Sequence, residues 1–350
     1  MNDGIKRRVR LATSFGVAGL TVCLNGCGGA SIQSAVNPAG PQADRLSHLW
    51  WFMFWVCGVV FVIVIVFTLL AVAKRAAGDA QMSPPILQPS LSEGRHRSVV
   101  IAAVAITIAI LFIFLVESFL VGRSLTAEIG HKNSVTIEIT GHQWWWEVRY
   151  PDSAPSNVFT TANEIHIPVG EPIYLDLRAT DVIHSFWAPN LMGKKDLIPG
   201  KNNVIWLQAD KPGVYRGQCA EYCGLQHAHM AFWIVAEPRE QFDEWRRNQV
   251  MTSAAPVTDS QRQGNQVFMS SSCVMCHAIN GTPAGSNIGP NLTHVASRST
   301  IAAATLANTR EHLQQWVTDS QQIKPGNKMP QNNFSEDNLN ALLDYLQSLK

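Results

Sequence analysis

The stretch CAEYCGLQHAHM, from Cys219 to Met230, decides how this chain is interpreted. It places two thiolates, an imidazole and a thioether on one short loop. Sulfur and imidazole ligands suit copper or zinc, and they suit magnesium or calcium poorly. A mononuclear blue-copper site uses one cysteine, two histidines and a weak methionine. The second cysteine therefore favours a dinuclear centre in which both sulfurs bridge two copper ions, whereas the loop taken alone also fits structural zinc.

A second metal signature follows in CVMCH, from Cys273 to His277. This is the C-x-x-C-H pattern of covalent haem attachment, in which Cys273 and Cys276 form thioethers and His277 is an axial ligand. Together with the KMP segment at 328–330 and a leucine-faced helix after it, the motif resembles a class I cytochrome c domain. That resemblance implies that Met329 is the distal haem ligand. Methionine and histidine together raise the haem potential and suit electron transfer.

Composition limits the function classes that remain. At 350 residues, the chain is long enough for two or three domains. Its formal net charge of +1 produces no long-range electrostatic field, which argues against nucleic acid as a partner. Four of the seven cysteines lie in the two metal motifs, which leaves little material for disulfide bonds.

The first 27 residues are predicted to be a signal peptide. A basic region at 6–10 precedes a short, mostly apolar stretch from Leu11 to Leu24. The following sequence, LNGC at 24–27, resembles a bacterial lipoprotein box, which would make Cys27 the lipidated first residue of the mature chain. The alternative is an ordinary or uncleaved signal in which Cys27 is an incidental thiol.

Two apolar segments within 45–123 are expected to form a transmembrane helix hairpin. No charged side chain occurs between Arg45 and Lys74, and a second apolar run covers 98–116. A spanning helix needs about 20 mostly apolar residues, so both segments qualify. The loop between them is richer in lysine and arginine than in acidic residues, and the positive-inside rule makes it cytoplasmic. Everything after the second helix then lies on the outer side of the membrane.

The pattern changes over 130–245 to short β-type runs with turn residues between them. Many short strands at regular spacing predict a β-sandwich or small barrel. The strands are expected at 135–140, 165–169, 173–177, 204–207 and 232–235.

A polar linker is expected at 246–261, and residues 262–350 are predicted to be helical. Thr309 and Ser335 are good N-caps for two of these helices. The second of them carries leucines at 339, 342, 343 and 346, which fall on one face.

The proposed copper pair needs a second histidine, and His184, in the stretch DVIHSFWAP that follows a predicted strand, is the best candidate. This stretch, the cysteine loop and the aromatic run GHQWWW at 141–146 are three motifs that match a single family. On these motifs, and over roughly residues 45–245, the chain resembles subunit II of haem-copper cytochrome c oxidases. The motifs together with the membrane hairpin argue against the zinc alternative.

The resemblance implies a cupredoxin-like domain that holds a CuA centre. In that family pattern two bridging thiolates, one histidine for each copper, a weak methionine ligand and one backbone carbonyl complete the site. These ligands correspond to Cys219, Cys223, His184, His227, Met230 and the carbonyl of Glu221.

Further roles come from the same resemblance. The Glu221 carboxylate would reach a magnesium ion shared with subunit I. Electrons from cytochrome c would enter through Trp144, and Asp181 would contribute to an acidic docking surface.

The family also has a glutamate for proton uptake near the cytoplasmic end of the second helix. Glu93 lies in that region, although its spacing to Trp144 is too long for a confident match. Glu117 interrupts the second apolar run and is a functional candidate by default, but we favour a carboxylate that faces a partner helix or the interface.

The sequence therefore predicts a multidomain membrane protein with a transmembrane hairpin, a cupredoxin-like β-domain and an all-α cytochrome c domain. It would be subunit II of a terminal oxidase of the caa type in the bacterial inner membrane, with its metal domains on the periplasmic side. Electrons would pass from cytochrome c through haem c and CuA to subunit I, which reduces oxygen to water and translocates protons, and subunit III would be a further partner. No catalytic residue is expected in this chain.

Two alternatives remain at this point. Nitric oxide reductases and nitrous oxide reductases can also use a CuA centre. The latter are soluble, so the membrane hairpin argues against them, and the neighbouring catalytic subunit would distinguish the former. A membrane-anchored copper-delivery protein is the other, and the fused haem motif argues against it.

Overall fold

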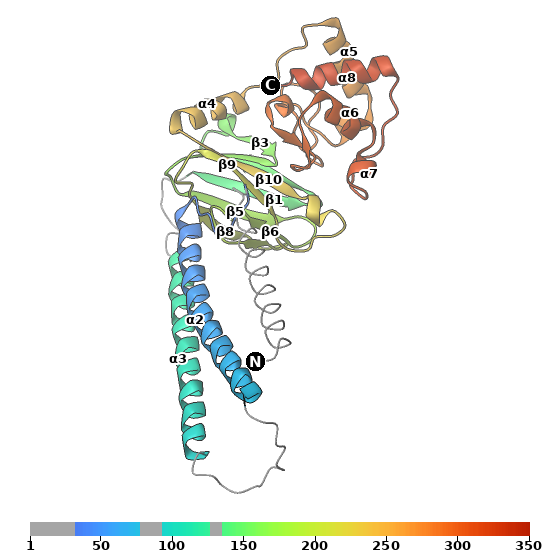
Figure 1. Cartoon of the computed structure of the whole chain (residues 1–350). Helices are drawn as coiled ribbons and strands as arrows, with labels where there is room; N and C mark the ends of the chain where they lie inside the picture. The colour runs from blue at the N-terminus through green and yellow to red at the C-terminus, as the bar shows by residue number, and fades with distance from the viewer. Residues whose placement is uncertain (1–31, 78–92, 127–134) are drawn as a thin grey trace.

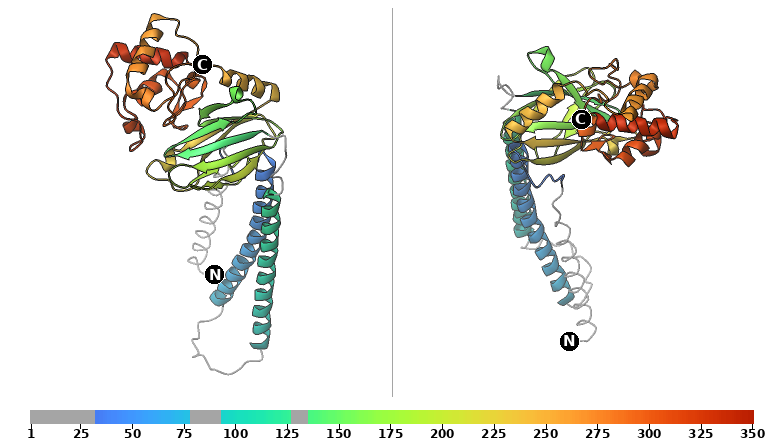
Figure 2. Two further views of the ribbon diagram at one scale, coloured as in Figure 1. Left: turned by 180° about the vertical axis from the view of Figure 1, so that it is seen from behind. Right: turned by 90° about the horizontal axis from the view of Figure 1, so that it is seen from above.

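A computed structural model describes residues 32–77, 93–126 and 135–350, which form a helical hairpin, a β-sandwich and a helical domain (Figure 1). This architecture confirms the predicted fold class. Cys27 and the rest of the expected signal peptide lie outside the described residues. The helical domain lies on the side of the sandwich that faces away from the hairpin, as the views from the front and the back both show (Figure 2).

The hairpin consists of α2 (Pro41–Ala77) and α3 (Glu93–Thr126), and both helices are long and apolar enough to cross a membrane. Their apolar side chains are exposed along most of both helices, as expected for helices whose surroundings are lipid. The helices extend past the predicted apolar runs, and their outer ends are attached to the sandwich. The indole of Trp206 donates to the carbonyl of Leu125 over 2.8 Å, and Gln42 donates to the carbonyl of Trp206. These bonds hold the sandwich at the end of the hairpin.

The sandwich contains ten strands in two five-stranded sheets, ordered β3-β2-β1-β5-β8 and β4-β10-β9-β6-β7. The strands of the first sheet are β1 (Thr136–His142), β2 (Trp145–Tyr150), β3 (Phe159–Ala162), β5 (Ile173–Ala179) and β8 (Asn203–Leu207). Those of the second are β4 (Glu164–Pro168), β6 (His184–Trp187), β7 (Lys195–Leu197), β9 (Gly213–Cys219) and β10 (Ala231–Glu237). Parallel pairing occurs between β1 and β5 and between β4 and β10, and the other strand pairs are antiparallel. Inward side chains such as Ile137 and Ile139 alternate with half-buried ones and fill one core between the sheets.

All five expected strand windows coincide with strands, namely β1, β4, β5, β8 and β10. The other five strands were not predicted. Three of them have four residues or fewer, and β9 carries two glycines, which weaken a strand signal.

The helical domain is built on the crossing of α5 (Asp259–Ser270) and α8 (Glu336–Ser348), with α6 (Arg310–Thr318) and α7 (Ser320–Ile323) beside them. Gly264 permits the close approach of α5 to α8, because a Cβ there would lie 2.0 Å from the carbonyl oxygen of Ala341. Thr309 and Ser335 cap α6 and α8 as predicted, each accepting a bond from a backbone N–H three residues later. The leucine face of α8 lies in the core of this domain.

The segment between the two outer domains is only partly extended. Helix α4 (Arg239–Val250) continues into the expected linker 246–261, and α5 begins at Asp259. Both helices thus overlap the expected linker, and the domain boundaries expected from sequence stay predictions.

The helical domain contacts the sandwich directly. Glu164 of β4 accepts hydrogen bonds from the backbone and side chain of Ser299, and its other oxygen lies 3.2 Å from Nε2 of His166. The opposite ring nitrogen of His166 lies 2.9 Å from Glu237, and the ring stacks on Trp245 of α4 with 4.1 Å between centroids. Burial lowers the pKa of His166, but the two carboxylates outweigh burial and raise the pKa overall.

Candidate metal centres

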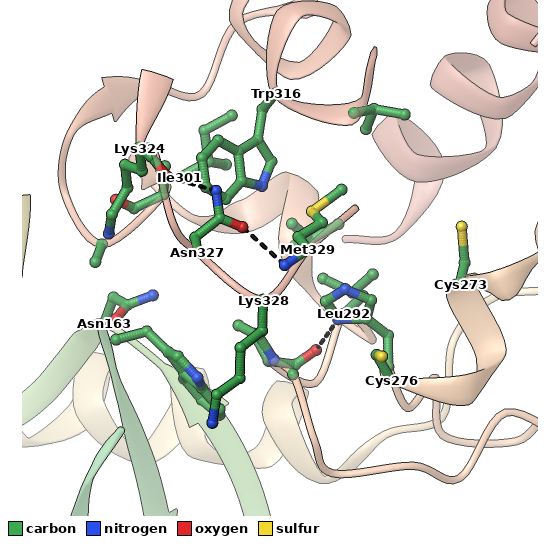
Figure 3. A pocket seen from close by; sticks show the side chains of 18 of the residues that line it. Asn163, Cys273, Cys276, Leu292, Ile301, Trp316, Lys324, Asn327, Lys328 and Met329 are labelled. Carbon is green, nitrogen blue, oxygen red and sulfur yellow. Dashed lines mark hydrogen bonds between the residues drawn. The ribbon is translucent and has the colours of Figure 1, made fainter. Parts of the chain in front are cut away.

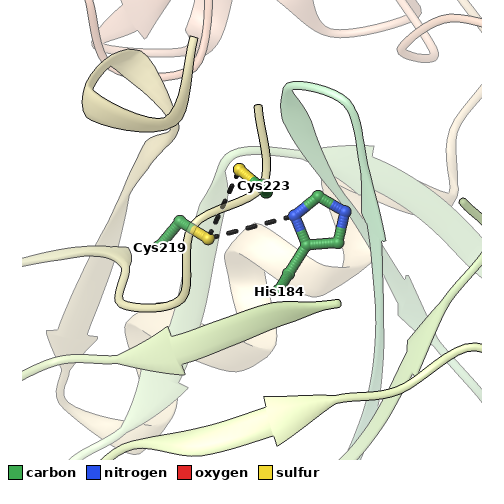
Figure 4. A group of neighbouring side chains, drawn as sticks. All are labelled: His184, Cys219 and Cys223. Carbon is green, nitrogen blue, oxygen red and sulfur yellow. Dashed lines mark hydrogen bonds between the residues drawn. The ribbon is translucent and has the colours of Figure 1, made fainter. Parts of the chain in front are cut away.

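The first centre lies where β6, β9 and the loop before β10 meet. Strand β9 ends at Cys219, and Phe186 of β6 pairs with Cys219, which brings His184 beside the cysteine loop. The two Sγ atoms lie 3.7 Å apart, and Nδ1 of His184 lies 3.9 Å from Sγ of Cys219 (Figure 4). All three side chains are buried, and their ligand atoms lie within 4.8 Å of one another.

The rest of the loop adds three donors around the same sulfurs. Nδ1 of His227 lies 3.6 Å from Sγ of Cys223, and Sδ of Met230 lies 3.8 Å from the same sulfur. The carbonyl oxygen of Glu221 lies 3.2 Å from Sγ of Cys219. The structure thus brings together all six groups that the sequence assigns to the copper centre.

The contact between the two thiols shifts their pKa values in opposite directions. The pKa of Cys219 falls below its usual range, because the thiol of Cys223 hydrogen-bonds the Cys219 thiolate and His184 adds a second hydrogen bond. The same interaction, together with burial, raises the pKa of Cys223. Without metal the pair therefore holds one proton between two sulfurs, and a metal that binds both must displace it. This donor set, two soft thiolates with imidazole and thioether, fits copper.

Asp181 orients the buried histidine. Its Oδ1 lies 2.8 Å from Nε2 of His184, which leaves Nδ1 directed at the sulfurs. The backbone N–H groups of Gln143 and Val182 donate to the same carboxylate over 2.7 Å each. Its side chain is 18% exposed, and both oxygens are engaged in these contacts. The contacts support a positioning role, and the docking role expected from sequence stays a prediction.

The second centre is a cavity in the helical domain (Figure 3). Cys273 and Cys276 line one side and Met329 another, and His277 and several apolar side chains also line the cavity. Nδ1 of His277 donates to the carbonyl of Pro290 over 2.7 Å, which leaves Nε2 free to bind a metal. Burial lowers the pKa of His277, so that the ring is neutral as a metal ligand must be.

The loop that carries Met329 is fixed by hydrogen bonds. Its carbonyl accepts from Ser320 and Gln321 over 2.7 and 2.8 Å, and its N–H donates to Asn327 over 2.8 Å. The thioether is therefore presented to the cavity by a rigid turn.

The charges in the lining also suit a haem. Among the described residues that line the cavity, Arg298, Lys324 and Lys328 are cationic and none is a carboxylate. The Nε of Arg298 is buried without a partner in the described part of the chain. A macrocycle that carries two propionates matches both features.

The wall opposite the haem motif belongs to the sandwich. Trp144 and Trp145, at the turn from β1 to β2, line the same cavity. The indole of Trp144 donates to the carbonyl of Cys223 over 2.9 Å, and the Gln143 amide donates to the same carbonyl over 2.8 Å. One side chain therefore contacts both the copper loop and the haem cavity.

Comparisons with known proteins agree with this geometry. Residues 154–237 match the family "Cytochrome C oxidase subunit II, periplasmic domain", and residues 261–350 match the family "Cytochrome c". Cytochrome c oxidase subunit 2 of Alkalihalophilus pseudofirmus is 38% identical over 340 residues, which cover 95% of each chain. The chain belongs to the cytochrome c oxidase subunit 2 family.

Two further comparisons concern a second full-length relative and a solved periplasmic domain. Cytochrome c oxidase subunit 2 of Bacillus subtilis is 28% identical, and the alignment covers 93% of this chain and 94% of that protein. The crystal structure of the periplasmic domain of subunit II of cytochrome oxidase from Bradyrhizobium japonicum is 34% identical. It covers 34% of this chain and 95% of that chain, with a TM-score of 0.32.

Family membership makes this chain the electron-transfer subunit of a cytochrome c oxidase, with a CuA copper centre and a haem as its cofactors. It decides against the nitric oxide reductase and copper-delivery alternatives. The apolar hairpin and the family together make it a membrane protein with periplasmic domains.

Three predicted carboxylates, those of Glu221, Glu117 and Glu93, have roles that the geometry does not test. The Glu221 side chain is 47% exposed, and its carboxylate lies 3.9 Å from Nζ of Lys194. Glu117 is exposed on α3, and Glu93 is the first residue of that helix. Their roles stay predictions.

Lys324 and Arg298 were not recognised from sequence. Lys324 stands in a polar segment with proline and glycine after it, where a lysine is normally solvated. No local pattern marks Lys324, because its partners at Trp144 and His229 lie far away in the chain.

Proposed function

We propose that Cys219 and Cys223 bridge two copper ions, with His184, His227, Met230 and the carbonyl of Glu221 as the other ligands. The proposal is supported by the convergence of these six groups within hydrogen-bonding distances of the two sulfurs. Asp181 would hold the His184 ring in place. When bound, the copper pair and the haem supply reversible one-electron transfer.

In the C-terminal domain, we propose that Cys273 and Cys276 bind the haem covalently and that His277 and Met329 are its axial ligands. The Pro290 carbonyl would keep the His277 ring in the orientation that presents Nε2. The apolar lining would exclude water, and Arg298 and Lys328 would face the propionates.

The position of Trp144 supports a route for the electron between the two centres. This residue lines the haem cavity and also hydrogen-bonds the copper loop. Electrons from an external cytochrome c would therefore enter through the C-terminal domain, pass Trp144 and leave the cysteine loop toward subunit I. Glu221 would contribute a ligand to magnesium at that exit, and subunit III would complete the complex in the bacterial inner membrane.

Trp144→Phe tests this route. The substitution keeps an aromatic ring but removes the donor to Cys223. In the purified oxidase, the haem of the C-terminal domain is reduced by a light pulse, and the transfer of the electron to copper is followed optically. We expect slower transfer with unchanged haem and copper contents.

Trp233→Phe is the matched control, because Nε1 of Trp233 has no hydrogen-bond partner in the described structure. The control should transfer electrons at the wild-type rate. Equal rates in Trp144→Phe and wild type would contradict the route.

A further inference from the structure

Lys324 is buried at the contact between the two outer domains. The residue comes directly after α7 in the chain and is 3% exposed. Its Nζ donates to the carbonyls of Trp144, His229 and Ala302 over 2.9, 2.8 and 3.3 Å. An ammonium has three N–H donors, so this site satisfies all of them with backbone oxygens. No carboxylate forms an ion pair with it among the described residues.

The three carbonyls come from both domains. Trp144 and His229 belong to the sandwich, at the proposed electron route and at the end of the copper loop, and Ala302 belongs to the helical domain. Burying an ammonium is costly unless its donors are paired. The native pairing exists only while the domains are docked, because separation would remove two of the three acceptors.

The third acceptor lies in a strained turn. Ala302, Ala303 and Ala304 all have φ between 55° and 57°, a conformation that is unfavourable for residues with a Cβ. The turn directs its carbonyls to the interface, since Ala303 accepts from the N–H of Ala231 over 3.2 Å. Such strain persists only where surrounding contacts impose it.

Lys324 is also connected to the haem side. Asn327 donates to the carbonyl of Lys324 through both its backbone and its side chain, and it accepts from the N–H of Met329. On the other side, Trp144 binds Lys324 through its carbonyl and Cys223 through its indole. Hydrogen bonds thus connect the Met329 loop to the copper loop through one lysine.

We propose that Lys324 is the positioning residue that docks the haem cavity onto Trp144 and the copper loop, and that electron transfer between the two centres depends on it. This inference rests on the proposed function of the two centres. It concerns the distance and register between them rather than their assembly.

The test is Lys324→Met in the complete oxidase. Methionine has a similar length and volume but neither charge nor donors, so three carbonyls lose their partner. The loss of these hydrogen bonds should lower the equilibrium constant for docking by about tenfold or more. We expect haem-to-copper transfer after a light pulse to slow by about that factor. The maximal turnover should fall with it, whereas the KM for external cytochrome c should not change.

The metal contents and spectra of Lys324→Met show whether slower transfer comes from positioning or from a damaged centre. Copper content, haem content and both optical spectra should match the wild type. Lys211→Met is the control, because it removes one exposed lysine of the sandwich and should leave the transfer rate unchanged.

Each outcome decides the question. Loaded Lys324→Met that transfers electrons at the wild-type rate would overturn the inference. If this variant does not assemble, Lys324→Gln, which is neutral but still donates, replaces it and is judged by the same rate. A wild-type chain without copper or haem would instead refute the proposed function.

Discussion

Gly141→Ala tests how tightly the sandwich holds the copper-binding histidine. A Cβ at this position of β1 would lie 2.8 Å from Cδ2 and 3.0 Å from Cγ of the His184 ring, and 3.3 Å from its Cβ. Ordinary van der Waals contact begins at 3.4 Å, so the ring must move by about 0.6 Å. His184 is fully buried, with Asp181 on Nε2 and the Trp146 ring beside it, which leaves it no free space.

The size of the effect follows from two opposing contributions. Alanine suits the strand better than glycine by roughly 0.5–1 kcal/mol. Overpacking of a filled core costs about 1–3 kcal/mol, so we expect a net loss of stability. Displacing a metal ligand through its surroundings weakens metal affinity by about 10- to 100-fold. Copper should therefore leave Gly141→Ala at a lower chelator concentration.

The assay is a chelator competition on the full chain, with copper measured by elemental analysis and thermal unfolding measured on the copper-free protein. Gly213→Ala is the matched control, because the nearest atom to its added Cβ is the Tyr215 oxygen at 3.4 Å. Equal copper affinity in Gly141→Ala and the control would refute the view that β1 fixes the histidine.

Other positions give independent tests. Asp181→Asn keeps the shape beside His184 but removes the charge, so copper affinity should fall by about 10- to 100-fold in the same competition, and an unchanged affinity would contradict the positioning role. Gly264→Ala should separate α5 from α8 and lower the melting temperature of the haem domain, measured by the haem absorption; an unchanged value would show that the helices do not cross as described. The raised pKa of His166 stabilises the fold below about pH 6.5, and this contribution is lost as the pH rises through the raised value. The stability difference between wild type and His166→Gln should therefore shrink as the pH rises from about 6.5 through the raised pKa, and a difference that stays constant with pH would refute the stabilising role of the His166 charge.

The copper centre could be predicted from sequence because its chemistry is local. Five of its six ligand groups lie within Cys219–Met230, and His184 stands in a recognisable motif. The apolar runs of the hairpin and the haem motif are local in the same sense. Each depends on residues that are neighbours in the chain, and these local motifs carry the resemblance to subunit II that implies the ligand set.

The docking of the domains could not be predicted, because its contacts join distant residues. Lys324 binds a carbonyl 180 positions earlier, and Ser299 binds Glu164 across 135 positions. Both are polar side chains whose ordinary place is the surface. Strands β6 and β7 were also missed, since four- and three-residue strands are specified by their partners rather than by their own periodicity.

The central claim is that one chain holds a sulfur-bridged copper pair and a covalent haem. Metal analysis and electron paramagnetic resonance of the purified full-length chain test it most directly. The account predicts two copper atoms and one haem per polypeptide, with a signal from one unpaired electron shared by two coppers. Zinc in place of copper, or a single copper atom per chain, would contradict it.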